Sequence, residues 1–191
     1  QSGDWGFTTG PYTFLSSTDA EPSYGQYLSI WKTDFKGVCK LALDLGISHQ
    51  KPLREPELNF TDPKNIKFFE QISPARLKQR QEIITTTDKL FSNTLMNDRT
   101  LAYDVFLAEH ARLLFPGEEP VIGKARINNF FGKNQISIEA EPIRADRALG
   151  SDLAYSYGIA YITKNKVITK YHYVRIWESQ EEQKWNVILE I

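Results

Sequence analysis

The chain has 191 residues, of which 41% are hydrophobic and 25% are charged, enough for one large domain or slightly more. Its 23 basic and 24 acidic residues nearly cancel, and no basic field of the kind that holds nucleic acid is present. No apolar stretch reaches the roughly 20 residues that span a membrane, and the single cysteine excludes an internal disulfide. We therefore expect neither nucleic acid nor a membrane as a partner.

Sequence patterns divide the chain into a strand-rich start, a connector and a helix-first remainder. Residues 1–48 carry three aromatic-rich runs separated by turn residues, which predicts an antiparallel meander. Residues 49–72 are rich in proline and asparagine and are interpreted as a linker. A long helix is expected from Ser73-Pro74 to about Met96, because serine is a favoured N-cap and proline suits the first helical position.

The remainder alternates shorter elements. A second helix is predicted over 99–110, followed by a strand over 111–115 and a third helix over 123–131. Residues 135–148 alternate with the period of a strand, and residues 155–191 read as three strands joined by two turns. Helices that precede an antiparallel sheet are typical of an α+β fold.

The closing meander repeats the opening one. The match runs without a gap over twenty positions, from Gln26 to Leu45, and a two-residue change in offset falls in the turn before them. The alternative is that two ordinary meanders share their strand composition. The matched pairs include Tyr27 and Tyr173, Trp31 and Trp177, and Asp44 and Glu190 at an offset of 146, and Gly10 and Gly158 at an offset of 148.

This repeat predicts a duplicated domain whose first copy is incomplete. Residues 1–48 are interpreted as the sheet half of a first domain, 49–72 as the linker, and 73–191 as a complete second domain. A meander cannot bury an apolar face alone, so its aromatic residues need a cover: the second domain, a second copy, or an upstream helical segment, which we favour as the native arrangement. These aromatic residues are Trp5, Phe7, Tyr12, Phe14, Tyr27 and Trp31.

Two stretches carry a resemblance to a known family. The segment "FLAEHARLLFPGEEPVIGKARINNFF" and the ending "YVRIWESQEEQKWNVILEI" resemble the NTF2-like superfamily, and within it the SnoaL-like and DUF4440-type domains. The resemblance implies an α+β, cystatin-like cone, with helices packed on a curved antiparallel sheet around a pocket. Where ketosteroid isomerases of this superfamily carry a base, the chain has Phe115, and Tyr173 stands at the position of their oxyanion-hole aspartate. We therefore predict no catalytic residue, no cofactor and no metal.

Candidate ligand-binding residues follow from strand alternation. Tyr171, Tyr173, Arg175 and Trp177 share one strand face, which the resemblance makes the concave one. Symmetric pairing about the turn at 182–183 places Arg175 opposite Glu190 and Trp177 opposite Ile188. An arginine and a carboxylate in a cavity could serve a ligand, or could form a self-neutralising salt bridge. The predicted ligand-binding residues are Tyr157, Tyr171, Tyr173, Arg175, Trp177 and Glu190.

Three functions compete at this point. The first is binding of a small hydrophobic or weakly acidic molecule without catalysis. The second is a lyase- or hydrolase-type enzyme in which Tyr173 and Arg175 polarise an oxygen, and the third is a dimerisation scaffold. A homodimer is expected, and the compartment is periplasmic or secreted if a signal peptide preceded Gln1 and cytoplasmic otherwise.

Overall fold

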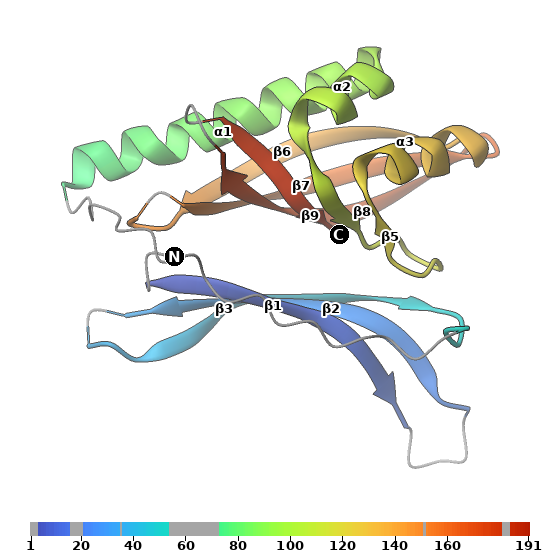
Figure 1. Cartoon of the computed structure of the whole chain (residues 1–191), viewed down its shortest axis with the longest axis horizontal. Coiled ribbons are helices and arrows are strands. Elements are labelled where there is room, and N and C mark those ends of the chain that lie inside the picture. Colours follow the sequence, from blue (N-terminus) through green and yellow to red (C-terminus); the bar gives the residue numbers. More distant parts are fainter. Residues whose placement is uncertain (1–3, 16–20, 35, 54–72, 151, 181–183) are drawn as a thin grey trace.

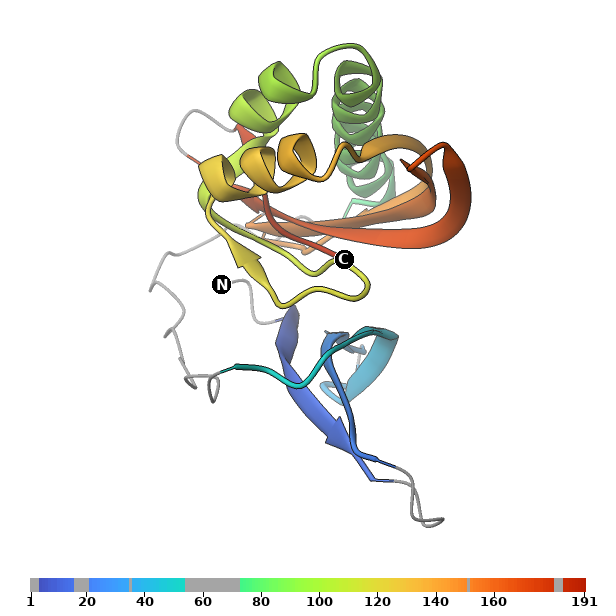
Figure 2. The ribbon, with the colours of Figure 1, turned by 90° about the vertical axis from the view of Figure 1, so that its right-hand side faces the viewer.

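The computed structural model describes residues 4–15, 21–34, 36–53, 73–150, 152–180 and 184–191. They form three layers: helices, a six-stranded sheet and a three-stranded sheet (Figure 1). The helices cover one face of the six-stranded sheet, and the three-stranded sheet lies against its other face, as the side view also shows (Figure 2). The helices are α1 (Pro74–Asn97), α2 (Arg99–Phe106) and α3 (Lys124–Lys133).

The six-stranded sheet has the order β5-β4-β9-β8-β7-β6. Among its described strands the neighbours pair antiparallel, except β4 and β9, which pair in parallel. The predicted α+β architecture, with helices first and a mainly antiparallel sheet after them, is confirmed. The strands are β4 (Leu107–Leu113), β5 (Val121–Ile122), β6 (Ser137–Arg147), β7 (Leu153–Lys164), β8 (Val167–Ser179) and β9 (Trp185–Glu190).

The three-stranded sheet is an antiparallel meander of order β1-β2-β3. Its strands are β1 (Trp5–Phe14), β2 (Ser23–Thr33) and β3 (Cys39–His49). Most of the predicted linker, residues 54–72, lies outside the described part of the chain, so how the meander is connected to α1 is not described.

The predicted second helix is too long. It ends at Phe106, and the next seven residues form β4. Leu107 and Leu113 pair with β9, so a place in the sheet overrides the local helical pattern. Asp98 begins α2 as its N-cap, because its side chain accepts a hydrogen bond from the Leu101 backbone N–H at 3.0 Å.

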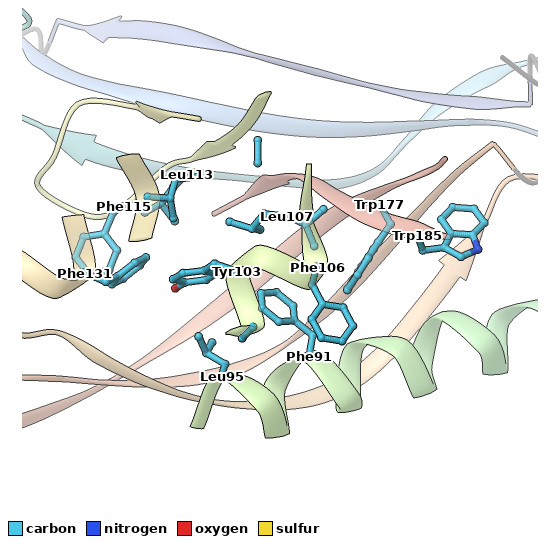
Figure 3. Packing of buried hydrophobic residues seen from close by; sticks show 14 of the residues in the cluster. Phe91, Leu95, Tyr103, Phe106, Leu107, Leu113, Phe115, Phe131, Trp177 and Trp185 are labelled. Carbon is cyan, nitrogen blue, oxygen red and sulfur yellow. The ribbon is translucent and has the colours of Figure 1, made fainter. Parts of the chain in front are cut away.

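A hydrophobic core lies between each two neighbouring layers. The first lies between the helices and the six-stranded sheet, and Figure 3 shows Phe91, Tyr103, Phe106 and Trp177 packed within it. In it Phe91 stacks on Phe106 with ring centroids 5.1 Å apart. None of the helices that the structure describes is both long and apolar enough to cross a membrane.

The second core lies between the two sheets. Leu28 and Ile30 of β2 pack with Val174 and Ile176 of β8, and Trp5 meets Tyr155 edge to face. Polar contacts join the same layers: Lys32 pairs with Asp146, and the Leu149 N–H donates to Asp4 Oδ2 at 2.9 Å. The six-stranded sheet therefore covers one face of the meander.

The aromatic residues of the meander do not share that one face. Trp5 is buried in the second core, whereas Trp31 bonds to Thr8 on the opposite face and is 37% exposed. Phe14 is 64% exposed. Both faces of the meander thus carry large side chains, and among the described residues the six-stranded sheet covers one of them.

Candidate functional site

Strand β8 directs alternate side chains to the helices and to the meander. Tyr173 and Arg175 bond to Asp88 of α1, and Trp177 packs edge to face on Phe91, with ring centroids 6.1 Å apart. Val174 and Ile176 lie in the core between the sheets. The predicted facing of Tyr173, Arg175 and Trp177 therefore agrees with the structure.

The register between β8 and β9 agrees with the expectation at one position and differs at the next. Arg175 pairs with Glu190, as symmetric pairing predicted. Trp177 pairs with Val187 and not with Ile188, because the register shifts by one between Ile176 and Trp177. A β-bulge of this kind leaves one residue unpaired on one strand.

Arg175 is the centre of a buried polar cluster. Its side chain is fully buried; Nη1 donates to Asp88 and, at 3.0 Å, to Ser92 Oγ. Its Nε donates to Glu190 Oε2 at 3.3 Å. The Tyr173 hydroxyl donates to the other Asp88 oxygen at 2.9 Å, so one helix carboxylate holds two residues of β8.

Asp88 and Ser92 were not among the predicted site residues. In the sequence, Asp88 reads as an interruption of the apolar stripe of α1. An acid at a core position of a helix needs a buried partner. This requirement was the one signal in the sequence that could have marked Asp88 as part of a polar site. The partner itself lies 87 residues away, so helical spacing alone could not identify it.

The cluster holds two carboxylates against one guanidinium. Burial opposes the charge on Arg175, but the carboxylates of Glu190 and Asp88 outweigh it and raise the pKa of Arg175 above its ordinary value. For Tyr173, in contrast, burial itself raises the pKa well above its ordinary value, because burial disfavours the charged phenolate. Both groups therefore keep their protons near neutral pH, and Arg175 remains a cation.

One donor of this cluster is unused. Arg175 Nη2 is buried and has no hydrogen-bond partner among the residues that the structure describes. Arg175 also lines a cavity of about 390 Å³. A buried donor without an acceptor is costly, so an acceptor that reached Nη2 from this cavity would be stabilised.

The cavity wall combines this polar end with apolar side chains of the six-stranded sheet and of the segment that follows β4. Four of the six predicted residues line it: Tyr171, Tyr173, Arg175 and Glu190. Strand β3 of the meander contributes residues 45–48 to the same wall. The apolar lining includes Leu113, Leu114, Phe115, Ile138, Ala160 and Ile162.

The other two predicted residues lie elsewhere. Tyr157 pairs with Val174 and packs in the core between the sheets, on the side away from the helices. Trp177 is fully buried, and its indole N–H donates to Ser156 Oγ at 2.8 Å. Neither lines the cavity, so the geometry assigns both to packing.

Within the described ranges, no three His, Cys, Asp or Glu side chains gather closely enough to hold a metal ion. A larger hollow of about 830 Å³ lies near the start of α2 and the end of α3. Its lining lacks the buried unpartnered donor of the smaller cavity, so the site is assigned to the latter.

Several solved structures are similar to part of this chain. An NTF2-like protein from Cytophaga hutchinsonii is 17% identical, with 57% of this chain and 93% of that chain covered and a TM-score of 0.48. An NTF2-like protein of unknown function from Pseudomonas putida is 12% identical, covering 63% and 87%, with a TM-score of 0.49. An LEH-like epoxide hydrolase from Mycobacterium tuberculosis is 12% identical, covering 58% and 80%, with a TM-score of 0.45.

The helices on one face of a mostly antiparallel sheet define an α+β fold, as the sequence predicted, and NTF2-like proteins are among the solved structures that it is similar to. At 12–17% identity the likeness concerns the fold alone. The sequence matches no protein-family model and no curated protein.

Proposed function

We propose that the cavity binds a small, mainly hydrophobic molecule through an acceptor group that takes a hydrogen bond from Arg175 Nη2. Two observations carry this proposal together: Arg175 lines the cavity, and its Nη2 is buried without a partner among the described residues. Apolar pockets with a few convergent polar groups are the usual form of small-molecule sites. A cavity of about 390 Å³ also supports binding over a pure scaffold, which would need no such space.

The charge of the cluster narrows the ligand class. Asp88 and Glu190 already bring two carboxylates to one guanidinium, and a ligand carboxylate would add a third negative charge in a buried site. A weakly acidic hydroxyl avoids that penalty, because it can accept from Arg175 and donate to Glu190. We therefore favour phenol-like or carbonyl ligands over carboxylic acids.

Three probes of similar shape test this proposal. 2-Naphthol offers a hydroxyl, 2-methylnaphthalene replaces it with a methyl group, and 2-naphthoate carries a full charge. Binding is followed by NMR shifts of the Leu113, Ile138 and Ala160 methyl groups, which line the cavity. We expect 2-naphthol to bind about tenfold more tightly than 2-methylnaphthalene, as one hydrogen bond to a charged group allows, and 2-naphthoate to bind more weakly than 2-naphthol.

A matched variant links the preference to one atom. Arg175→Lys keeps a cation beside Asp88 and Glu190 but has no Nη2. We expect it to bind 2-naphthol and 2-methylnaphthalene equally, with urea unfolding as the check that it remains folded. Equal binding of these two probes by the unmodified protein would refute the proposal.

Catalysis by a lyase- or hydrolase-type enzyme remains the second candidate, and Glu190 is the observation that supports it. Its carboxylate lies on the cavity wall and is held by Arg175, so it could accept a proton from a bound substrate. Tyr173 is not suited to polarise a substrate oxygen, because its hydroxyl already donates to Asp88. If Glu190 acts as a base, the protein should exchange the acetyl protons of 2-acetylnaphthalene in D₂O, and Glu190→Gln should abolish that exchange.

A further inference from the structure

We propose that the outer face of the three-stranded sheet docks an amphipathic α-helix that presents a basic side chain to Asp44. The outer face is the one turned away from the six-stranded sheet, and its main side chains are Thr8, Tyr12, Tyr27, Trp31, Leu41 and Asp44. This inference is independent of the cavity and of its ligand. It follows from a position-by-position correspondence between the two sheets.

The first correspondence is a hydrogen bond of tryptophan. The Trp177 indole N–H donates to Ser156 Oγ on the neighbouring strand at 2.8 Å. The Trp31 indole N–H donates to Thr8 Oγ1 on its own neighbouring strand at 3.2 Å. These pairs occupy positions that match in the aligned sequences, so both the residue types and the contact recur.

The second correspondence is an acid on the next strand, followed by a bulge. Arg175 pairs with Glu190, and the register shifts directly after Ile176. Ser29 pairs with Asp44, and the register shifts directly after Ile30. The Ser29 hydroxyl donates to Asp44 Oδ1 at 2.5 Å, where the six-stranded sheet has an arginine–glutamate ion pair.

The matching face of the six-stranded sheet is covered by α1. Asp88 of that helix bonds to Arg175, and Phe91, three residues later, packs on Trp177. On the three-stranded sheet, no helix of the described residues lies over the equivalent positions, because α1, α2 and α3 lie beyond the six-stranded sheet (Figures 1 and 2). Trp31 is 37% exposed and Leu41 is 51% exposed.

The charge on the outer face specifies the helix that fits. On the six-stranded sheet an arginine meets an acid of α1, whereas the outer face carries Asp44 with Ser29 in place of the arginine. A helix lying as α1 does must therefore bring a cation to Asp44. In α1, Phe91 follows Asp88 by three residues and packs on Trp177. The docked helix should likewise carry an apolar side chain three residues after its cation, where that side chain would cover Trp31.

This helix comes from a polypeptide segment other than 74–133. Those residues hold α1, α2 and α3, which already cover the six-stranded sheet. The inner face of the meander is likewise occupied, with Leu28 and Ile30 fully buried. Of the two faces of the described meander, the outer one offers apolar area together with an exposed acid.

Two stapled helical peptides test the proposal against the whole 191-residue protein. Both contain residues 74–97, linked between positions 82 and 86, which are exposed in α1. One peptide carries Asp88→Arg and the other keeps Asp88. Binding is measured by titration, with the NMR signal of the Trp31 indole N–H as the local reporter.

We expect the Asp88→Arg peptide to bind about tenfold more tightly than the Asp88 peptide, and to shift the Trp31 signal. Asp44→Asn should remove this preference without unfolding the protein, because Asp44 is exposed. Equal affinity of the two peptides, no binding of either, or an unchanged preference in Asp44→Asn would overturn the proposal. A dimer in solution that Trp31→Glu converts to a monomer would identify a second copy as the occupant and would also overturn it.

Discussion

Asp88 and Arg175 form an ion pair in which neither side chain is exposed to solvent. The pair joins the middle of α1 to the middle of β8 and is flanked by Phe91, whose ring lies 4.1 Å from the Arg175 guanidinium carbon. Fully buried charges are costly to desolvate. Their presence inside the first core marks the place where the fold favours a polar site over apolar packing.

Removing the cation from this cluster should destabilise the fold. Arg175→Ala leaves Asp88 and Glu190 buried without their shared partner, and we expect a loss of roughly 3–5 kcal/mol in the free energy of unfolding. Urea denaturation followed by tryptophan fluorescence measures it. A change near zero would mean that water reaches the cluster in solution.

A triple variant separates the charge effect from the packing effect. Asp88→Leu, Arg175→Met and Glu190→Gln together remove both carboxylates and the guanidinium while keeping similar volumes. Replacing a buried ion cluster in this way is often neutral or stabilising, so we expect stability near that of the unmodified protein. The same variant should lose its preference for 2-naphthol, because Nη2 is gone.

Two glycines at matching positions offer a second comparison. A methyl group at position 158 would lie 2.7 Å from Tyr173 Cε1 and closer still to the Glu141 carbonyl. Neither can move freely, so Gly158→Ala should cost about 1–3 kcal/mol.

At position 10 the nearest atom to an added methyl group is Tyr27 Cε1 at 3.3 Å. Tyr27 is only half-buried and can shift towards solvent, so Gly10→Ala should stay within about 0.5 kcal/mol of the unmodified protein. Similar losses for both variants, measured by urea denaturation, would contradict the openness of the outer face.

Local patterns were sufficient for much of this architecture. Pro74 does begin α1, and symmetric pairing about one turn does bring Arg175 opposite Glu190. Both depend on residues close in sequence, where backbone geometry restricts the choices. Strand alternation placed Tyr173 and Arg175 on one face, and the family resemblance made that face the helix side, where both bond to Asp88 of α1.

The missed features depend on contacts between distant segments. The partnership of Asp88 with Arg175 requires the placement of α1 over β8, and the bulge after Ile176 moved Trp177 from Ile188 to Val187. Tyr157 was misplaced because the register between β7 and β8 was unknown. Its pairing with Val174 puts it on the meander side.

Acid should weaken the contact between the two sheets. Burial alone would raise the pKa of Asp146, but the Lys32 ammonium and the Gln81 amide outweigh it and hold the pKa below the ordinary value of 3.8. A carboxyl whose pKa is lower in the folded state stabilises the fold above pH 3.8, and that contribution is lost as the pH falls through the lowered value.

Lys32→Met should therefore flatten the acid limb of the curve of stability against pH. Lys40→Met is the comparison. Lys40 also lowers the pKa of its partner Asp34, but the Lys40 side chain is 66% exposed against 31% for Lys32, so solvent screens its ion pair more strongly. We expect urea midpoints between pH 2 and 5 to change less steeply for Lys32→Met than for Lys40→Met. Parallel curves would show that Asp146 does not owe its lowered pKa to Lys32.

Trp31 and Trp177 provide the sharpest comparison between the two sheets, because they make the same hydrogen bond on faces that differ in cover. Trp177 is fully buried beneath Phe91, so Trp177→Ala should cost roughly 3–5 kcal/mol through the cavity that it leaves. Trp31 is partly exposed, and Trp31→Ala should cost no more than about 1 kcal/mol. Saturation with the Asp88→Arg peptide should widen the loss for Trp31→Ala, since the variant has less surface for the helix to bury, while leaving the loss for Trp177→Ala unchanged. If Trp31→Ala without peptide is as damaging as Trp177→Ala, the outer face is already covered in solution.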